Sequence, residues 1–114
     1  MFIELVLSEP QNFNQEELAD VSRYCREVLA EDEENGEAYH FMGMMYEGGY
    51  GVNLEPKTAL LYYNKAARHE NSNAYIKLGM CYMNGFGVEQ DMKEALKHFQ
   101  KVRETHPIVL VYMG

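Results

Sequence analysis

The feature that most constrains this chain is an internal repeat of 36 residues. Positions 38–52 align with positions 74–88 without a gap. Over positions 38–67 and 74–103, twelve of thirty residue pairs are identical, whereas unrelated segments of ordinary composition share about two. Units of this kind bury their apolar faces by stacking on one another, so the repeat predicts a solenoid.

Each copy of the repeat predicts two helices. In the first helix, apolar residues such as Ala38, Met42 and Met45 recur at the three-to-four spacing that gathers side chains on one buried face. A glycine stands in the middle of this helix in both copies, at Gly43 and Gly79. Glycine costs about 1 kcal/mol relative to alanine inside a helix, so we expect the neighbouring helix to pass too close for a Cβ at these positions.

Glycines and capping residues set the predicted helix ends. Gly49 and Gly85 follow the first helices, where a left-handed residue closes a helix. The second helix starts with Pro56 in copy one and with a capping box, Asp91 and Glu94, in copy two. The expected helices of the two copies are residues 37–47, 56–69, 73–84 and 92–104.

A further helix is expected upstream of the repeats, because Asn14 and Glu17 form a capping pattern ahead of an apolar stripe that runs to about Ala30. Its pattern is that of the second helix of a repeat that stands without a first helix. In the second helices of the repeats, the pairs 59–60 and 95–96, each Ala followed by Leu, are expected to face inward. The chain, 1–114, is expected to form one domain, with an N-terminal segment (1–13), a lone helix and turn (14–35), repeat one (36–72), repeat two (73–106) and the start of a truncated third repeat (107–114).

Net charge and the first residues of the chain argue against several function classes. The sequence holds 18 acidic and 10 basic residues, a formal charge of -8, and such a field repels phosphate backbones and anionic lipids. Nucleic acid and membrane are therefore not expected as partners. Residues 1–7 lack a basic region and are interrupted by Glu4, so they predict neither a secretory signal nor a membrane span. The cytoplasm is the default compartment.

No motif in the sequence predicts catalysis, a metal or a cofactor. Cys25 and Cys81 lie 56 positions apart without the spacing of a disulfide framework or a zinc site. The four histidines show no pair at helical ligand spacing. Cys81 stands on an apolar stripe, where burial makes a thiol unreactive. We therefore expect no catalytic residues, no metal, no cofactor and no enzyme activity.

The repeated residues combine into the pattern Ala-x-x-x-(Met/Leu)-Gly-x-x-Tyr-x-x-Gly-x-Gly-Val, followed by Lys-x-Ala-Leu. Over roughly residues 36–104 this pattern resembles the Sel-one-like repeat, a relative of the tetratricopeptide repeat. The resemblance implies an all-α fold, a right-handed α-α superhelix (solenoid) of helix-turn-helix repeats. It also implies that the first helices line a concave surface, which proteins of this family use as adaptors to hold partner proteins.

The chain departs from the family pattern in a few places. Val102 and Arg103 replace the paired alanines that usually close the second helix, and Val109 replaces an alanine in the third unit. Some members of the family carry one disulfide in each unit. Here the counterpart of Cys81 is Met45, so that subclass is not matched.

The resemblance assigns a partner-binding groove to the exposed face of the first helices. We expect it to be rich in methionine with an acidic edge, and to bind a protein or peptide whose apolar stripe is flanked by basic residues, since flexible methionines adapt to such stripes. The spacing leaves Met44 and Met80 open to either groove or core positions. The predicted groove residues are Glu37, His40, Met44, Glu47, Asn73, Ile76, Met80 and Met83.

An alternative function is a self-assembling or spacer segment of a larger repeat protein. The apolar run 108–113 ends the chain without a polar cap, and solenoids need capped ends to stay soluble. A homodimer through residues 108–113 is therefore the second expectation beside the adaptor.

Overall fold

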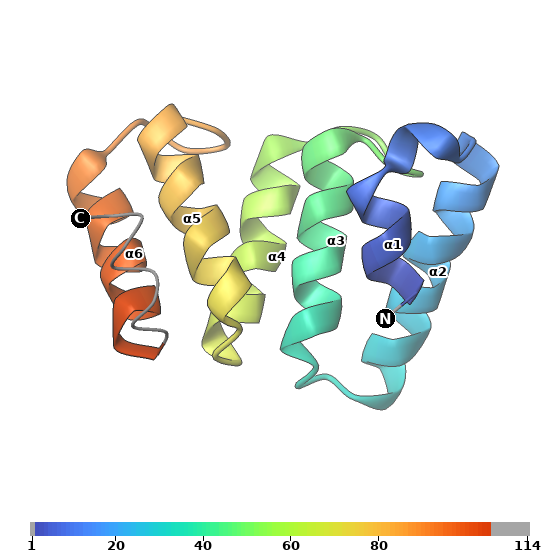
Figure 1. Ribbon diagram of the computed structural model, residues 1–114, viewed down its shortest axis with the longest axis horizontal. Helices are drawn as coiled ribbons and strands as arrows, with labels where there is room; N and C mark the ends of the chain where they lie inside the picture. The colour runs from blue at the N-terminus through green and yellow to red at the C-terminus, as the bar shows by residue number, and fades with distance from the viewer. Residues whose placement is uncertain (1, 106–114) are drawn as a thin grey trace.

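The computed structural model describes residues 2–105, and in this range the chain is helical. The helices stand side by side in a row that runs from α1 and α2 at one end to α5 and α6 at the other (Figure 1). The five predicted helices are confirmed to within one residue at each end. The elements are α1 (Phe2–Ser8), the 3-10 helix η1 (Pro10–Asn12), α2 (Gln15–Glu31), α3 (Gly36–Gly48), α4 (Pro56–Arg68), α5 (Ser72–Asn84) and α6 (Met92–Thr105).

Helix α1 lies in a segment for which the sequence predicted no structure. It buries Ile3, Val6 and Leu7, which are 3%, 2% and 5% exposed, in a core cluster shared with α2 and α3. A helix of seven residues is too short to be stable alone, so this packing accounts for its formation. With α1 in place, α2 becomes the second helix of an incomplete unit that precedes the two repeats.

Among residues 2–105, two clusters of buried side chains make up much of the core. The first lies between α1, α2 and α3 and contains Met42 and Met45, both 0% exposed, as predicted. The second lies between α4 and α5 and contains Ala59, Tyr63, Leu78 and Cys81. Met44 and Tyr46 of α3 pack against both clusters, so the core runs from unit to unit.

The expectation for the central glycines is confirmed. A Cβ at Gly43 would lie 2.5 Å from the ring of Tyr63, and a Cβ at Gly79 would overlap the ring of Phe99. Tyr63 and Phe99 occupy the same position in successive repeats. The close neighbour is therefore an aromatic ring on the second helix, and the repeat conserves both halves of the contact.

The glycine-rich turns connect each repeat to the unit before it. Gly49 and Gly85 end α3 and α5 in the left-handed conformation, as predicted. Further along each turn, a Cβ at Gly51 would meet the backbone between residues 18 and 19 of α2, and a Cβ at Gly87 would lie 2.7 Å from the carbonyl oxygen of Pro56. Each turn thus lies on the backbone at the start of the preceding second helix. Gln15 adds a side-chain contact in the first case: its Oε1 accepts from the Gly51 N–H at 2.7 Å.

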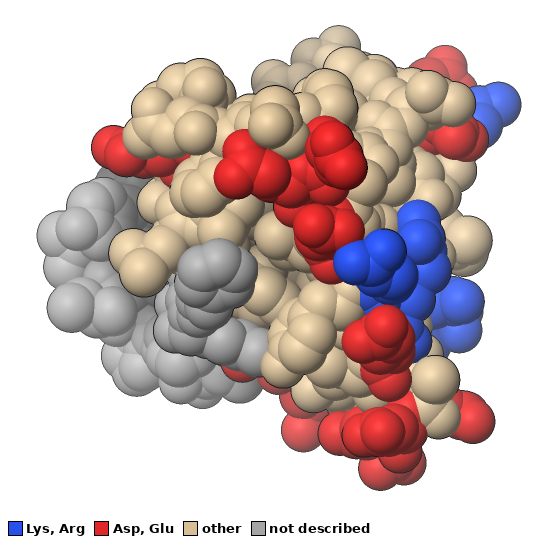
Figure 2. All heavy atoms as spheres, turned by 90° about the vertical axis from the view of Figure 1, so that its right-hand side faces the viewer, with Lys and Arg blue, Asp and Glu red and all other residues tan. Residues whose placement is uncertain are grey.

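The end of the molecule that carries α1 and α2 presents many acidic side chains. Figure 2 looks onto this end and shows Asp and Glu side chains above and below a smaller basic group. Arg23 is one of the basic residues of α2 and pairs with Asp20 at 2.6 Å. The exposed acidic residues of α2 are Glu16, Glu17, Asp20, Glu27 and Glu31.

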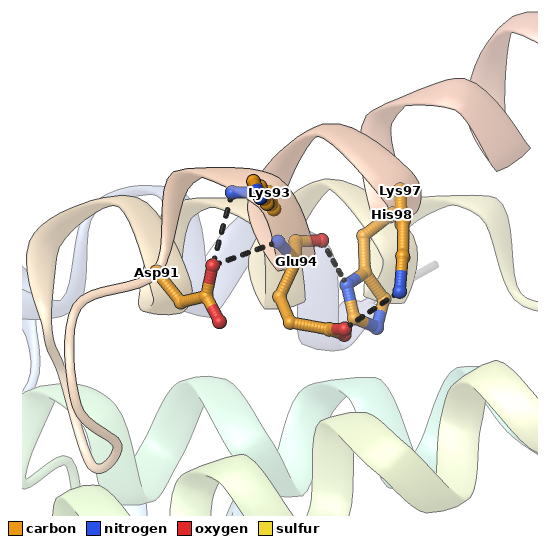
Figure 3. A network of polar contacts seen from close by, with 5 residues as sticks. All are labelled: Asp91, Lys93, Glu94, Lys97 and His98. Atoms are coloured by element: carbon orange, nitrogen blue, oxygen red, sulfur yellow. Dashed lines mark hydrogen bonds and ion pairs between the residues drawn. The ribbon is translucent and has the colours of Figure 1, made fainter.

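At the other end, α6 begins after the predicted N-cap residue Asp91, but the capping box predicted for Asp91 and Glu94 does not form, because the Asp91 N–H donates to the Tyr82 carbonyl oxygen at 2.8 Å. The Asp91 carboxylate accepts hydrogen bonds from the backbone N–H groups of Lys93 and Glu94, while the Glu94 side chain pairs with Lys97 at 3.0 Å (Figure 3). Ala95 is buried, but Leu96 is 52% exposed, so the inward orientation predicted for Leu96 is wrong. Its counterpart on α4 is partly buried because α5 packs there, and no described element covers α6 in the same way.

Candidate functional site: a trough between α3 and α5

The first helices of the two repeats border a trough, which we call the α3–α5 trough. It consists of two pockets of about 390 and 230 Å³ that share Lys77. The larger pocket is lined by Leu7, Ser8, Glu37, His40, Phe41, Met44, Asn71, Asn73, Ile76 and Lys77. The smaller pocket is lined by Glu47, Lys77, Met80, Cys81, Asn84 and Phe86.

Most of the predicted groove residues line this trough. The larger pocket brings together Glu37, His40, Met44, Asn73 and Ile76. The smaller pocket contains Glu47 and Met80. Met83 lines neither pocket.

Sequence reasoning missed several lining residues. Leu7 and Ser8 come from α1, which was not predicted, and nothing in the repeat pattern points to them. Lys77 could have been found, because it stands four residues after Asn73 and three before Met80, and this spacing places all three on one face of the helix. Helical spacing within the second copy was therefore the usable signal.

Glu47, which lines the smaller pocket, connects three helices. Its Oε1 accepts a hydrogen bond of 2.5 Å from the Tyr63 hydroxyl of α4 and lies 3.6 Å from the Lys77 ammonium of α5. Burial, together with the Glu47 carboxylate, raises the pKa of Tyr63 far above its usual value, which keeps the hydroxyl protonated as a donor. The charge of Glu47 is compensated within the molecule, and Glu37 remains as the exposed acidic side chain of the larger pocket.

The two methionines whose positions the sequence left open differ in their surroundings. Met44 is partly buried and packs against both core clusters. Met80 is 42% exposed at the smaller pocket. His40, also predicted in the groove, is only 7% exposed, and its ring lies against the rings of Phe41 and Tyr63. Met80 is therefore a surface side chain, whereas Met44 and His40 also belong to the packing of the trough floor.

The cysteines are free thiols with little access to solvent. Burial raises the pKa of Cys25 and of Cys81 to about 11, which lowers the thiolate fraction that a nucleophile needs. Among residues 2–105, no group of three or more His, Cys, Asp and Glu side chains could hold a metal ion. In the same range no helix is long and apolar enough to span a membrane. The segment 108–113, predicted to dimerise, lies outside the described residues.

Comparison with solved structures finds the same architecture in bacterial proteins. The Sel1 repeat protein from Oxalobacter formigenes has a TM-score of 0.66 and 28% sequence identity over 80% of this chain. Helicobacter pylori cysteine rich protein B has a TM-score of 0.66 and 26% identity, covering 90% of this chain and 73% of its own. The present chain spans only 39% of the Oxalobacter protein. No curated protein matches the sequence.

The family assignment rests on the repeats themselves. The model of the Sel1 repeat matches residues 36–71 and 72–101, which is more than half of the chain. These segments coincide with the helix pairs α3–α4 and α5–α6, and the fold agrees with that of the solved Sel1 repeat protein. Sel1 repeats generally act as protein–protein interaction modules. The chain belongs to the Sel1 repeat family.

Proposed function

We propose that the α3–α5 trough binds a peptide or helix of a partner protein, and that the chain acts as a non-catalytic adaptor. The observation that carries this proposal is that the two pockets adjoin, with Lys77 lining both. Equivalent positions of successive repeats line the trough, such as Met44 and Met80. A surface built in this way extends along the solenoid and suits an elongated ligand better than a small molecule.

The larger pocket suggests the chemistry of the ligand. Met44 and Ile76 supply apolar surface above the buried Phe41, while the exposed residues Glu37 and Asn73 supply polar groups. A volume of about 390 Å³ is at the lower end of the range for ligand pockets, so it suits one or two side chains rather than a whole helix. We expect a large apolar side chain to enter this pocket, with a neighbouring Lys or Arg beside Glu37.

Selection from a random peptide library displayed on phage tests this proposal directly. Peptides that bind the immobilised chain should contain an apolar residue close to Lys or Arg. Glu37→Lys and Met80→Glu should each weaken their binding about tenfold or more, because one reverses the charge of the larger pocket and the other places a charge in the smaller pocket. Affinity is measured by fluorescence polarisation with the selected peptides.

Matched controls separate a loss of binding from a loss of folding. Glu89→Lys and Leu61→Glu make the same chemical changes at exposed residues that line neither pocket, and binding should be unchanged. Met44→Glu is unsuitable as a probe because Met44 packs against both core clusters. If the peptides bind all four variants with the affinity of the wild type, the trough is not the binding site.

A further inference from the structure

We propose that copies of this chain associate head to tail, with α6 of one copy packed on the outer face of α1 and α2 of the next. This inference is independent of ligand binding in the trough. The outer face holds a pocket of about 570 Å³, which we call the head pocket. It is lined by Ile3, Val6, Phe13, Glu17, Asp20, Val21 and Tyr24.

Inside the molecule, the corresponding face of each first helix is covered by the second helix of the preceding unit. Helix α2 packs against α3 next to Met42 and Met45, and α4 packs against α5 next to Leu78 and Cys81. These pairs are three residues apart, which places both side chains on one face of the first helix. On α1, Ile3 and Val6 have the same spacing and line the head pocket. Both are already buried, at 3% and 2% exposed, so they form the floor of the pocket and the open surface belongs to other lining residues. The spacing on α1 thus matches the face on which a second helix packs inside the molecule.

The exposure of Tyr24 supports the same interpretation. The turn at Gly51 lies on α2 at Leu18, and the turn at Gly87 lies on α4 at Pro56. Tyr24 stands six residues after Leu18 on α2, and Tyr62 stands six residues after Pro56 on α4, so the two tyrosines occupy equivalent positions. Tyr62 is partly buried next to the first core cluster, whereas Tyr24 is 50% exposed. Tyr24 thus has the position of a side chain that is covered when a unit precedes it.

Helix α6 is the second helix that has no following unit among the described residues. Its exposed apolar residues are Met92 (50%) and Leu96 (52%). Leu60, the counterpart of Leu96 on α4, packs against the cluster shared with α5. An α6 placed on the head pocket of another copy would cover Leu96 just as α5 covers Leu60.

Charges at the two ends are complementary. Lys93 and Lys97 are exposed beside the apolar residues of α6 and are visible in Figure 3, where Lys97 pairs with Glu94 on the surface of the helix. The head pocket is lined by two exposed acidic residues, Glu17 and Asp20, of which Asp20 pairs with Arg23 on the surface, and Figure 2 shows that this end carries many acidic side chains. Opposite charges of this kind favour association and fix orientation. Because the two surfaces lie at opposite ends of one chain, a second copy supplies both the shape and the charge that each end requires.

Such a contact is heterologous, so an open array of copies keeps one free α6 and one free head pocket at its ends, to which further copies bind. For the 114-residue chain, the weight-average molar mass from sedimentation equilibrium should exceed that of the monomer and rise with concentration. Leu96→Asp blocks the α6 end and Tyr24→Asp blocks the head pocket. Each should raise the dissociation constant about tenfold or more, since a charge must then be buried at the contact.

Mixing the two variants gives the decisive result. Leu96→Asp keeps an intact head pocket and Tyr24→Asp keeps an intact α6, so an equimolar mixture should form a complex of two chains and no larger species. Leu61→Asp is the matched control, because Leu61 is also 52% exposed but lies on α4, and its mass distribution should equal that of the wild type. Circular dichroism verifies that all variants are folded.

Three outcomes would overturn the proposal. The wild type could remain monomeric up to millimolar concentration. The mixture of the two variants could stay monomeric although the wild type associates. Finally, association could survive Leu96→Asp and disappear only in Val109→Glu/Val111→Glu, which would assign it to residues 108–113 instead.

Discussion

The two repeats have nearly the same helix boundaries but different neighbours. Repeat one lies between α2 and α5, whereas repeat two has a described neighbour on one side only. The difference shows in equivalent side chains. Leu60 is partly buried and Leu96 is 52% exposed. Tyr63 donates to Glu47, while repeat two has Phe99 and Met83 at these positions and makes no such bond.

This comparison separates what a repeat determines from what its neighbours determine. The glycine-to-ring contact occurs in both copies, at Gly43 and at Gly79, so it belongs to the fold of one unit. The burial of Leu60 and the bond that joins Tyr63 to Glu47 belong to the interior of the array. Equal substitutions at equivalent positions should therefore have unequal effects on stability.

The largest difference is expected at the central glycines. Gly43→Leu should lower the free energy of unfolding by about 3 kcal/mol or more, because the side chain overlaps the Tyr63 ring in a closely packed core. Gly79→Leu should cost less, since Phe99 is partly exposed and α6 can move outward. Urea denaturation followed by circular dichroism measures both. If Gly79→Leu lowered the free energy of unfolding as much as Gly43→Leu or more, neighbouring units would not determine the cost of the substitution.

A smaller difference is expected at the paired leucines. Leu60→Ala should cost about 2 kcal/mol, because it leaves a cavity at the contact between α4 and α5. Leu96→Ala should change stability by less than about 0.5 kcal/mol, as is usual for an exposed residue. The same denaturation experiment, at a concentration low enough to keep the chain monomeric, compares them. Similar losses for the two variants would mean that another segment covers Leu96.

The hydrogen bond of Tyr63 provides a third comparison. Tyr63→Phe should cost about 1.5 kcal/mol, since it removes a buried donor to a carboxylate. Phe99→Tyr should bring no gain, because position 83 is methionine and offers no equivalent acceptor. Chemical denaturation at neutral pH measures the two changes. Stabilisation by Phe99→Tyr would show that repeat two contains another acceptor for the new hydroxyl.

The smallest effect concerns the thiols at alkaline pH. The pKa of Cys25 and of Cys81 rises from 9.0 to about 11 on folding, mainly through burial. The unfolded chain therefore loses these protons first, so stability present below pH 9 should decline between pH 9 and 11. In Cys25→Ala/Cys81→Ala this decline should be shallower, as measured by urea denaturation at several pH values. An unchanged slope would indicate that the thiols titrate alike in both states.

Much of the fold could be predicted from the sequence because the same glycines and apolar spacings occur in both copies of the repeat. The glycines at 43 and 79 and the turn glycines at 49 and 85 were interpretable from local chemistry alone. Helix α1 could not be predicted, because its stability comes from Ile3 and the neighbouring core rather than from capping or length. The orientation of Leu96 was wrongly predicted because a repeat pattern identifies a packing face but not whether a neighbour covers it.

The trough was predicted in part for a related reason. The alignment of the two copies predicts on which face of the helix a residue lies. Asn73 and Ile76 were placed in the groove in this way, and both line the larger pocket. The alignment does not give contacts between helices. The ion pair between Glu47 and Lys77 joins residues 30 positions apart, and only the packing of α3 beside α5 brings them together.

The contact of each glycine-rich turn with the preceding helix has a consequence for how such proteins evolve. At Gly51 and at Gly87 the atoms nearest to an added Cβ are main-chain atoms of the preceding helix, which every sequence possesses. At the first junction the Gln15 side chain adds hydrogen bonds to the turn. A newly duplicated unit therefore meets the same main-chain surface on its predecessor, so arrays can lengthen by gene duplication while most surface residues of each unit diverge.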